Sequence, residues 1–280
     1  MGHNQAQSQG HELKRTEVRL NREEIYKGHL VLINQIHPVE QPLHSEQLRP
    51  LNTHPAIKEW RKGMLLEREC LQHFAALLEA SQGMNEIIAV SGYRTKQEQV
   101  GIYEGSLVEN GPQYTARYVA LPDHSEHQIG LAIDVGVMND EVDFIAPAFP
   151  DSGAAKRFKE LAAEYGFIQR YQEEKESITG ISCEPWHFRY VGYPHAKIME
   201  DRQLCLEEYI EFLQGYTFSG EHLEFTNKST EINIYYVPAE ENDTMIPILE
   251  CDDYRISGTN GNGFIVTAFV RAQVKVADAQ

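Results

Sequence analysis

Two short polar segments place the strongest constraint on how this chain can fold. The first runs from Ser125 to Asp134 and contains His127, and the second is Glu184-Pro-Trp-His187. Together they offer two imidazoles and one carboxylate that could bind a metal, with a second carboxylate left over. If these groups share one site, the fold must bring together two segments that lie some fifty residues apart.

The spacing within the first segment predicts a turn. His127 and Asp134 are seven residues apart. On a regular strand an odd spacing puts two side chains on opposite faces. Both can therefore reach one ion only if the chain turns between them, and Gly130 is the residue best able to turn. We expect the β-branched run over residues 131–137 to follow as a strand, and residues 186–192 to form another.

The residue types fit the chemistry of a catalytic zinc ion, which needs three protein ligands and an open position for water. Two neutral histidines and one aspartate would leave the ion a net positive charge, which lowers the pKa of bound water toward about 7 and polarises a carbonyl. A carboxylate that is not a ligand could then pass a proton from that water to a leaving amine. Glu184 suits this role, because it lies three residues before His187 and because Pro185 disfavours a helical conformation at Glu184.

Arg94 follows an apolar run at a predicted strand-to-helix turn. A fixed guanidinium there could stabilise the oxyanion of a tetrahedral intermediate or hold a substrate carboxylate. Plainer interpretations stay open at this point. One histidine among twelve is usually not a ligand, and Glu184 could simply pair with Arg94 or Arg189. Cys183 could be a further ligand, although a small packed side chain is its expected role.

Periodicity predicts the main elements. Apolar residues at three- and four-residue steps predict a helix over 56–80. A capping box at Thr95 predicts a second helix that reaches about Asn110. Further helices are expected over 154–165 and 204–215, further strands over 86–92 and 167–171, and a strand or extended segment over 29–39.

The chain divides into three parts on its pattern. Residues 1–25 are polar and expected to be flexible. Residues 26–215 contain the polar constellation. After residue 215 the pattern changes to alternating and β-branched runs with a hairpin signal at Asn260-Gly261, so we predict a β-rich extension over residues 216–280.

Composition excludes several classes of partner. The formal net charge is −17, and residues 200–253 alone contribute −12. A chain this acidic is poorly suited to bind nucleic acid or anionic membranes. No segment approaches the roughly 20 apolar residues of a membrane span, and the start of the chain lacks the apolar stretch of a signal peptide. If this N-terminus is the native one, we expect a cytoplasmic protein. The four cysteines form no Cys-x-x-Cys pair and are expected to be reduced.

The pattern Ser-x-His-x-x-Gly-x-Ala-x-Asp over residues 125–134, followed by Glu-Pro-Trp-His over residues 184–187, resembles the D-alanyl-D-alanine carboxypeptidases and dipeptidases of the VanY/VanX type. Ser-Gly-Tyr-Arg-Thr at residues 91–95 belongs to the same pattern, and the bifunctional VanXY type is most similar. The resemblance covers about residues 28–215. It implies a zinc peptidase that removes D-Ala from peptidoglycan precursors, in vancomycin resistance or cell-wall metabolism. The implied fold is α+β, a small antiparallel sheet surrounded by helices.

The resemblance also implies roles for individual residues. One zinc ion per chain would be held by His127, Asp134 and His187. Glu184 would be the general base, and Arg94 would stabilise the transition state. Four further positions match those that line the substrate site in such enzymes: Ser125, Gln99, Tyr171 and Trp186.

Two other functions stay open. The first is an L,D-carboxypeptidase or another murein peptidase on the same scaffold, because the metal acts on the amide and not on its stereochemistry. The second is a zinc-containing module that binds muropeptides without catalysis. It would require the general base to be missing or displaced, whereas Glu184 is present. The implied substrates are anionic, so we expect the acidic residues 200–253 to face away from the site.

Overall fold

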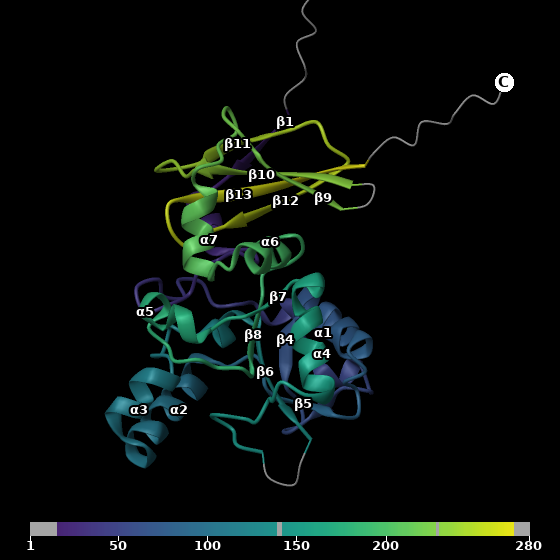
Figure 1. The fold of residues 1–280 in the computed structure, drawn as a ribbon. Coiled ribbons are helices and arrows are strands. Elements are labelled where there is room, and N and C mark those ends of the chain that lie inside the picture. Colours follow the sequence, from purple (N-terminus) through teal and green to yellow (C-terminus); the bar gives the residue numbers. More distant parts are fainter. Residues whose placement is uncertain (1–15, 139–141, 228–229, 272–280) are drawn as a thin grey trace, which may run out of the picture.

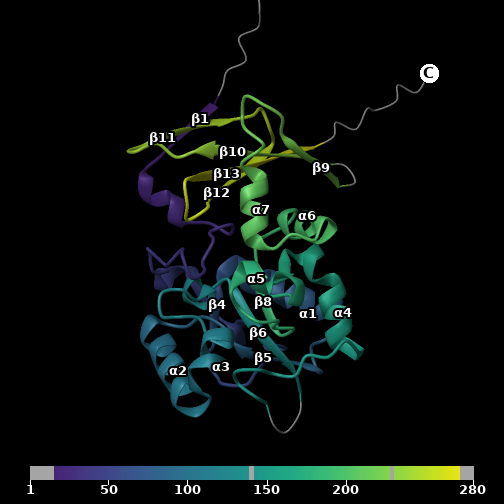
Figure 2. The ribbon, with the colours of Figure 1, turned by 60° about the vertical axis from the view of Figure 1, so that its left-hand side comes forward.

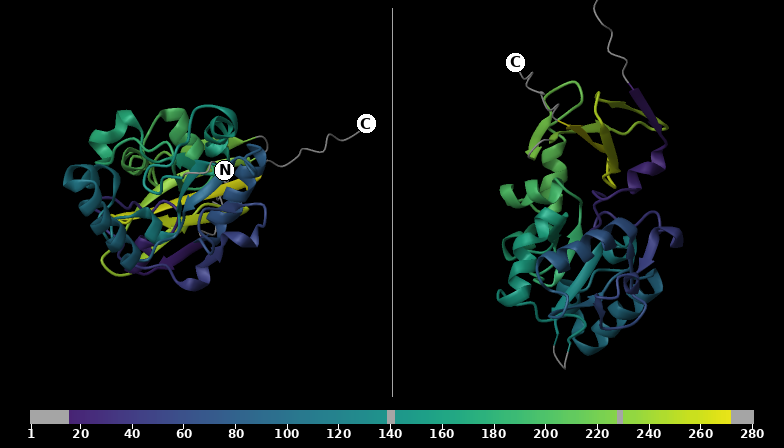
Figure 3. Two further views of the ribbon diagram at one scale, coloured as in Figure 1. Left: turned by 90° about the horizontal axis from the view of Figure 1, so that it is seen from below. Right: turned by 90° about the vertical axis from the view of Figure 1, so that its right-hand side faces the viewer.

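The computed structural model describes residues 16–138, 142–227 and 230–271, which form two lobes stacked end to end (Figures 1 and 3). One lobe is built on a five-stranded sheet and the other on a four-stranded antiparallel sheet. Helices α6 (His195–Arg202) and α7 (Leu206–Leu213) lie between the two sheets. The mixture of helices with small, mostly antiparallel sheets confirms the predicted α+β class.

The five-stranded sheet has the order β3-β5-β6-β8-β7, with β3 parallel to β5 and the other pairs antiparallel. Its strands are β3 (Lys58–Glu59), β5 (Ile87–Ser91), β6 (Ala132–Val137), β8 (His187–Tyr190) and β7 (Phe167–Gln169). Two short strands beside it, β2 (Leu48–Pro50) and β4 (Leu65–Glu67), pair with each other.

Helices cover the two sides of this sheet differently. The helices α1 (Arg68–Ala80) and α4 (Gly153–Leu161) lie on one side, and α2 (Lys96–Glu109), α3 (Gly111–Tyr118) and the short α5 (Glu176–Thr179) lie elsewhere around it (Figures 1 and 2). The side chains of α1 and α4 share one hydrophobic core with Ile133 and Val135 of β6. Because side chains alternate along a strand, Asp134 lies on the opposite face. That face carries the polar groups.

The capping box predicted at Thr95 is present. The Thr95 amide donates to the Glu98 carboxylate at 2.7 Å, and the Glu98 amide donates to the Thr95 hydroxyl at 3.2 Å. Two of the unpaired amides at the start of α2 are thereby satisfied. The helix begins at Lys96, as the sequence predicts.

The helix predicted over residues 56–80 is wrong in its first half, because α1 begins only at Arg68. Gly63 adopts a left-handed conformation with a φ of +87°, which ends any helix there. The Glu67 carboxylate accepts the amides of Glu69 and Cys70 and caps α1 at that point. The apolar spacing before Gly63 therefore does not reflect a helix; Trp60 stacks on Phe144 instead, with ring centroids 5.4 Å apart.

Residues 29–39 form no strand of a sheet. Residues 31–33 lie outside regular structure, and a turn follows that is closed by an isolated bridge between Asn34 and His37. Side chains satisfy part of its backbone: the Arg189 guanidinium donates to the carbonyls of His29 and Val31, and the Ser257 hydroxyl accepts the Leu30 amide. Residues 30–33 are thus buried between the lobes, whereas Ile36 is 79% exposed.

The second lobe holds the β-rich extension. Its antiparallel sheet has the order β12-β13-β10-β9, formed by β9 (Leu223–Asn227), β10 (Thr230–Pro238), β12 (Asp253–Gly258) and β13 (Gly263–Arg271). The predicted turn at Asn260-Gly261 lies between β12 and β13, with a φ of +56° at Asn260. Tyr209 of α7 packs in one hydrophobic cluster with Ile234 and Ile265 of this sheet, so the lobes share a core.

The flexible segment predicted over residues 1–25 is wrong for residues 16–25. Strand β1 (Thr16–Leu20) pairs antiparallel with β11 (Thr244–Ile248), more than two hundred residues away, and Arg22–Tyr26 forms a 3₁₀ helix. Residues 1–15 lie outside the described residues. The strand was missed because its composition is polar, and it buries few side chains of its own. The division of the chain after residue 215 stays a prediction.

Two further sequence expectations concern the whole chain. No helix among the described residues is both long and apolar enough to cross a membrane. All four cysteines are free, with Cys70 and Cys205 buried, which confirms the prediction of unpaired thiols.

Candidate metal centre and active site

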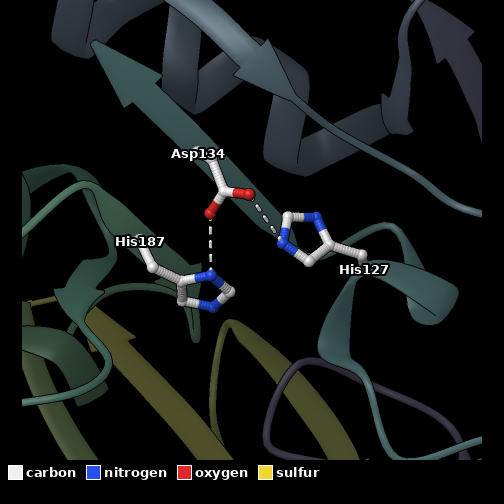
Figure 4. Close-up of side chains that lie close together, drawn as sticks. All are labelled: His127, Asp134 and His187. Carbon is white, nitrogen blue, oxygen red and sulfur yellow. Dashed lines mark hydrogen bonds and ion pairs between the residues drawn. The ribbon is translucent and has the colours of Figure 1, made fainter. Parts of the chain in front are cut away.

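Asp134 and His187 lie side by side because their strands pair. They are direct partners in the antiparallel register of β6 and β8. Such partners have neighbouring side chains on one face of the sheet. Here Nδ1 of His187 lies 2.9 Å from Oδ1 of Asp134 (Figure 4). The two polar segments predicted to converge do so through this strand pair.

His127 reaches the same point from a turn. It lies in a 3₁₀ helix, Glu126–Ile129, that ends at Gly130, whose φ is +64°. A Cβ at Gly130 would lie 3.0 Å from the Glu67 amide nitrogen, so only glycine fits both the conformation and the space. Nε2 of His127 comes to 3.2 Å from Oδ2 of Asp134 (Figure 4). The turn predicted at Gly130 is confirmed.

The donor set of these three residues fits a cation. One ligand atom from each lies within 4.8 Å of the others, and all three residues are buried. Nδ1 of His127 lies 2.7 Å from the Gly92 carbonyl, which can only accept, so the ring proton belongs on Nδ1. The lone pair of Nε2 then faces the Asp134 carboxylate. Two acceptors in contact repel unless a cation or a proton lies between them.

The charge states follow from the surroundings. Burial lowers the pKa of His127 to about 4 and keeps it neutral at pH 7. Burial would raise the pKa of Asp134, but the charges and hydrogen bonds of the two histidines hold it well below its ordinary value. For His187, hydrogen bonds to Asp134 and Glu126 outweigh burial and raise the pKa to about 9. Binding of a metal at this centre would therefore require His187 to lose a proton.

Glu184 lies next to this centre and is only 5% exposed. Its Oε2 atom is 3.8 Å from Nδ1 of His187. Burial raises the pKa of Glu184 to about 8, against the opposing charge of His187. The alternative in which Glu184 pairs with Arg189 is wrong, because the Arg189 guanidinium binds Glu126 at 2.7 Å and backbone carbonyls. A buried carboxylate of this kind exchanges a proton near neutral pH.

Arg94 is fixed by three acceptors. Its guanidinium donates to the Ser91 hydroxyl at 2.8 Å, to Oδ2 of Asp134 at 2.8 Å and to Oε1 of Gln99 at 3.3 Å. The last two contacts tie it to the metal centre and to α2. A guanidinium held this way presents a fixed positive charge to a ligand.

One cavity brings together all nine residues singled out in the sequence. The lining residues include Arg94, Gln99, Ser125, His127, Asp134, Tyr171, Glu184, Trp186 and His187. Apolar side chains that the sequence did not indicate complete the wall: Ile102, Phe144, Ile145 and Ile181. No described residue after His187 lines this cavity, and the second lobe lies at the other end of the molecule (Figure 2). The expectation that the acidic residues 200–253 face away from the site is confirmed for those that the structure describes.

Glu126 is a site residue that the sequence reasoning missed. It lines the same cavity, is 1% exposed, and contacts His187, Arg170 and Arg189. Its place beside His127 was visible in the sequence. Its burial against two arginines was not, because they come from β8 and from a segment after β7.

A His-Asp-His centre beside an unliganded carboxylate and a fixed guanidinium is typical of metal-dependent hydrolases. Comparison with known proteins gives the family. The sequence profile of the family described as VanY, D-alanyl-D-alanine carboxypeptidase, matches residues 63–193. The bifunctional D-Ala-D-Ala dipeptidase and D-Ala-D-Ala carboxypeptidase VanXYC of Enterococcus gallinarum is 46% identical over 188 residues, which are 66% of this chain and 94% of that protein. The chain therefore belongs to the VanY family of D-alanyl-D-alanine peptidases.

One solved structure extends the similarity to the second lobe. The vancomycin resistance D,D-dipeptidase VanXYg, solved with a D-Ala-D-Ala phosphinate analogue, matches 91% of this chain and 99% of its own, at 44% identity and a TM-score of 0.86. The LD-carboxypeptidase LdcB matches 64% of this chain and 84% of its own, at 32% identity and a TM-score of 0.55. The family resemblance of the motifs is confirmed, and the β-rich extension has a counterpart in VanXYg.

Proposed function

We propose that this protein is a zinc-dependent D,D-peptidase that hydrolyses D-Ala-D-Ala and removes the terminal D-Ala of the peptidoglycan precursor pentapeptide. In a glycopeptide-resistance setting, this reaction would remove the target of vancomycin. The observation that carries the proposal is the buried Glu184 carboxylate beside the His127–Asp134–His187 centre. The likeness to a bifunctional dipeptidase and carboxypeptidase supports both substrates.

His127, Asp134 and His187 would hold one zinc ion per chain. When bound, zinc would polarise the scissile carbonyl and lower the pKa of a water molecule. Glu184 takes the proton of the attacking water and returns it to the amine of the departing D-Ala. Its carboxylate is buried 3.8 Å from Nδ1 of His187, within reach of the metal centre.

Arg94 supplies the positive charge that an anionic substrate needs. Its position between Asp134 and Gln99 at the cavity wall supports a contact with the developing oxyanion or with the substrate carboxylate. Ser125, Tyr171 and Trp186 line the remaining wall. Tyr171 also packs against the His187 ring, with centroids 5.0 Å apart, and so limits the movement of that imidazole.

A substrate panel tests the proposal. Zinc-loaded protein is incubated with D-Ala-D-Ala, with the pentapeptide precursor that ends in D-Ala-D-Ala, and with the tetrapeptide whose last bond is L,D. We expect release of D-Ala from the first two and not from the third. Release only from the tetrapeptide would support the L,D-carboxypeptidase alternative, and muropeptide binding without release would support the non-catalytic module. Metal analysis gives the zinc stoichiometry, and cell fractionation tests the predicted cytoplasmic location.

A further inference from the structure

We propose that Glu126 is a positioning residue for His187: its carboxylate accepts the Nε2 proton of that imidazole and so turns Nδ1 toward the metal. This inference rests on the metal centre proposed above. It concerns which nitrogen of His187 is available to a metal and how the ring is held.

The two nitrogens of His187 face two different carboxylates. Nδ1 lies 2.9 Å from Oδ1 of Asp134, inside the centre. Nε2 points the other way and lies 3.4 Å from Oε2 of Glu126. A neutral imidazole has one N–H. If that proton is donated to Glu126, the lone pair lies on Nδ1 and faces the metal centre.

His127 is arranged in the same way with a different acceptor. Its outer nitrogen, Nδ1, lies 2.7 Å from the Gly92 carbonyl, while its inner nitrogen faces Asp134. In metal sites the outer nitrogen of a ligating histidine commonly donates to a carbonyl or carboxylate, which fixes the tautomer. Glu126 completes this arrangement for the second histidine.

Two buried arginines keep the Glu126 carboxylate charged and fixed. Oε1 accepts from Nε of Arg170 at 2.8 Å and from Nη1 of Arg189 at 2.7 Å. The side chains of all three residues are 0% exposed. The two carboxylate oxygens therefore have different partners. Oε1 accepts from the arginines, and Oε2 is left to accept from His187. A buried carboxylate without such partners would take up a proton and cease to be a strong acceptor.

The same network offers a matched control. Arg170 also donates to both oxygens of Glu207 on α7, at 2.9 and 2.7 Å. Glu207 accepts from Asn34 at 3.1 Å as well, and no contact between Glu207 and His187 is found among the described residues. Removing the charge of Glu207 disturbs the arginine network, just as removing the charge of Glu126 would. Only the loss of the Glu126 charge also affects the contact with the His187 imidazole.

Glu126→Gln and Glu207→Gln separate positioning from stability. In Glu126→Gln, the single amide oxygen cannot serve both the arginines and His187. If it faces the arginines, the amide NH₂ faces Nε2 and forces the ring proton onto Nδ1. We expect zinc affinity, measured by competition with a chelator, to fall on the order of 10–100-fold in Glu126→Gln. We expect Glu207→Gln to keep the wild-type affinity.

A spectroscopic readout tests the tautomer directly and needs no variant. In ¹⁵N imidazole spectra of the zinc-loaded wild type, we expect His187 to carry its proton on Nε2. A proton on Nδ1 would overturn the inference, as would equal losses of zinc affinity in the two variants or no loss in either. If Glu126→Gln does not fold, the wild-type spectrum decides. Failure of the wild type to bind zinc would instead overturn the proposed metal centre itself.

Discussion

Acid should weaken the contact between the two lobes through His195. This residue begins α6 and is 6% exposed. Nδ1 lies 2.8 Å from the Tyr209 hydroxyl on α7, and Nε2 lies 2.9 Å from the Thr267 hydroxyl on β13. Burial, together with the charges of His29 and Arg255, lowers the pKa of His195 to about 3.

The pH dependence has a definite sign. Above the unfolded pKa of about 6.5 both states are neutral, and the folded state keeps its full stability. As pH falls below 6.5, His195 becomes protonated in the unfolded state but stays neutral in the folded state. The free energy of unfolding therefore decreases. The loss is about 2 kcal/mol at pH 5 and approaches about 5 kcal/mol near pH 3, where folded His195 itself titrates.

Urea denaturation followed by circular dichroism measures this loss. Metal-free protein is used, so that release of zinc makes no contribution. The matched variant is His195→Gln, whose amide keeps one donor and one acceptor for the two hydroxyls but does not titrate. Between pH 7 and pH 5 the wild type should lose about 2 kcal/mol more than the variant. Parallel losses in the two proteins would refute the assignment of this effect to His195.

Three further substitutions test local geometry. Gly130→Ala should lose stability by about 1–3 kcal/mol and weaken zinc binding, because the left-handed turn and the contact with Glu67 exclude a Cβ; unchanged melting and zinc titration would contradict this. Arg94→Lys should lower kcat/KM while zinc content is kept, since an ammonium cannot reach all three acceptors. Thr95→Ala should cost about 1 kcal/mol in thermal unfolding by removing the cap of α2, and a cost within error would argue against the cap.

Local rules predicted the parts of the fold that depend on neighbouring residues. The capping box at Thr95, the turn at Gly130 and the strand predicted over residues 131–137 each follow from a few adjacent positions. The helix expected from residue 56 failed because Gly63 and the Glu67 cap, and not the apolar spacing, decide where α1 starts.

Long-range pairing was beyond such rules. Strand β1 forms only because β11 lies beside it, and no sequence pattern near residue 16 predicts that pairing. The role of Glu126 depends in the same way on Arg170 and Arg189, which join it from distant segments. Residue types and spacing indicated five of the nine cavity residues: Arg94, His127, Asp134, Glu184 and His187. The other four, Gln99, Ser125, Tyr171 and Trp186, came only from the motif resemblance, which records positions that the fold brings together.

The central claim is that Glu184 acts as the general base beside a metal site. The most direct test is the rate of D-Ala release by Glu184→Gln, measured together with the zinc content of the variant. This variant keeps the shape of the side chain and leaves the three metal-binding residues intact. The account predicts full zinc occupancy and a fall in kcat on the order of 10²–10⁴-fold, the usual contribution of a general base. Zinc-loaded Glu184→Gln that releases D-Ala at the wild-type rate would contradict it.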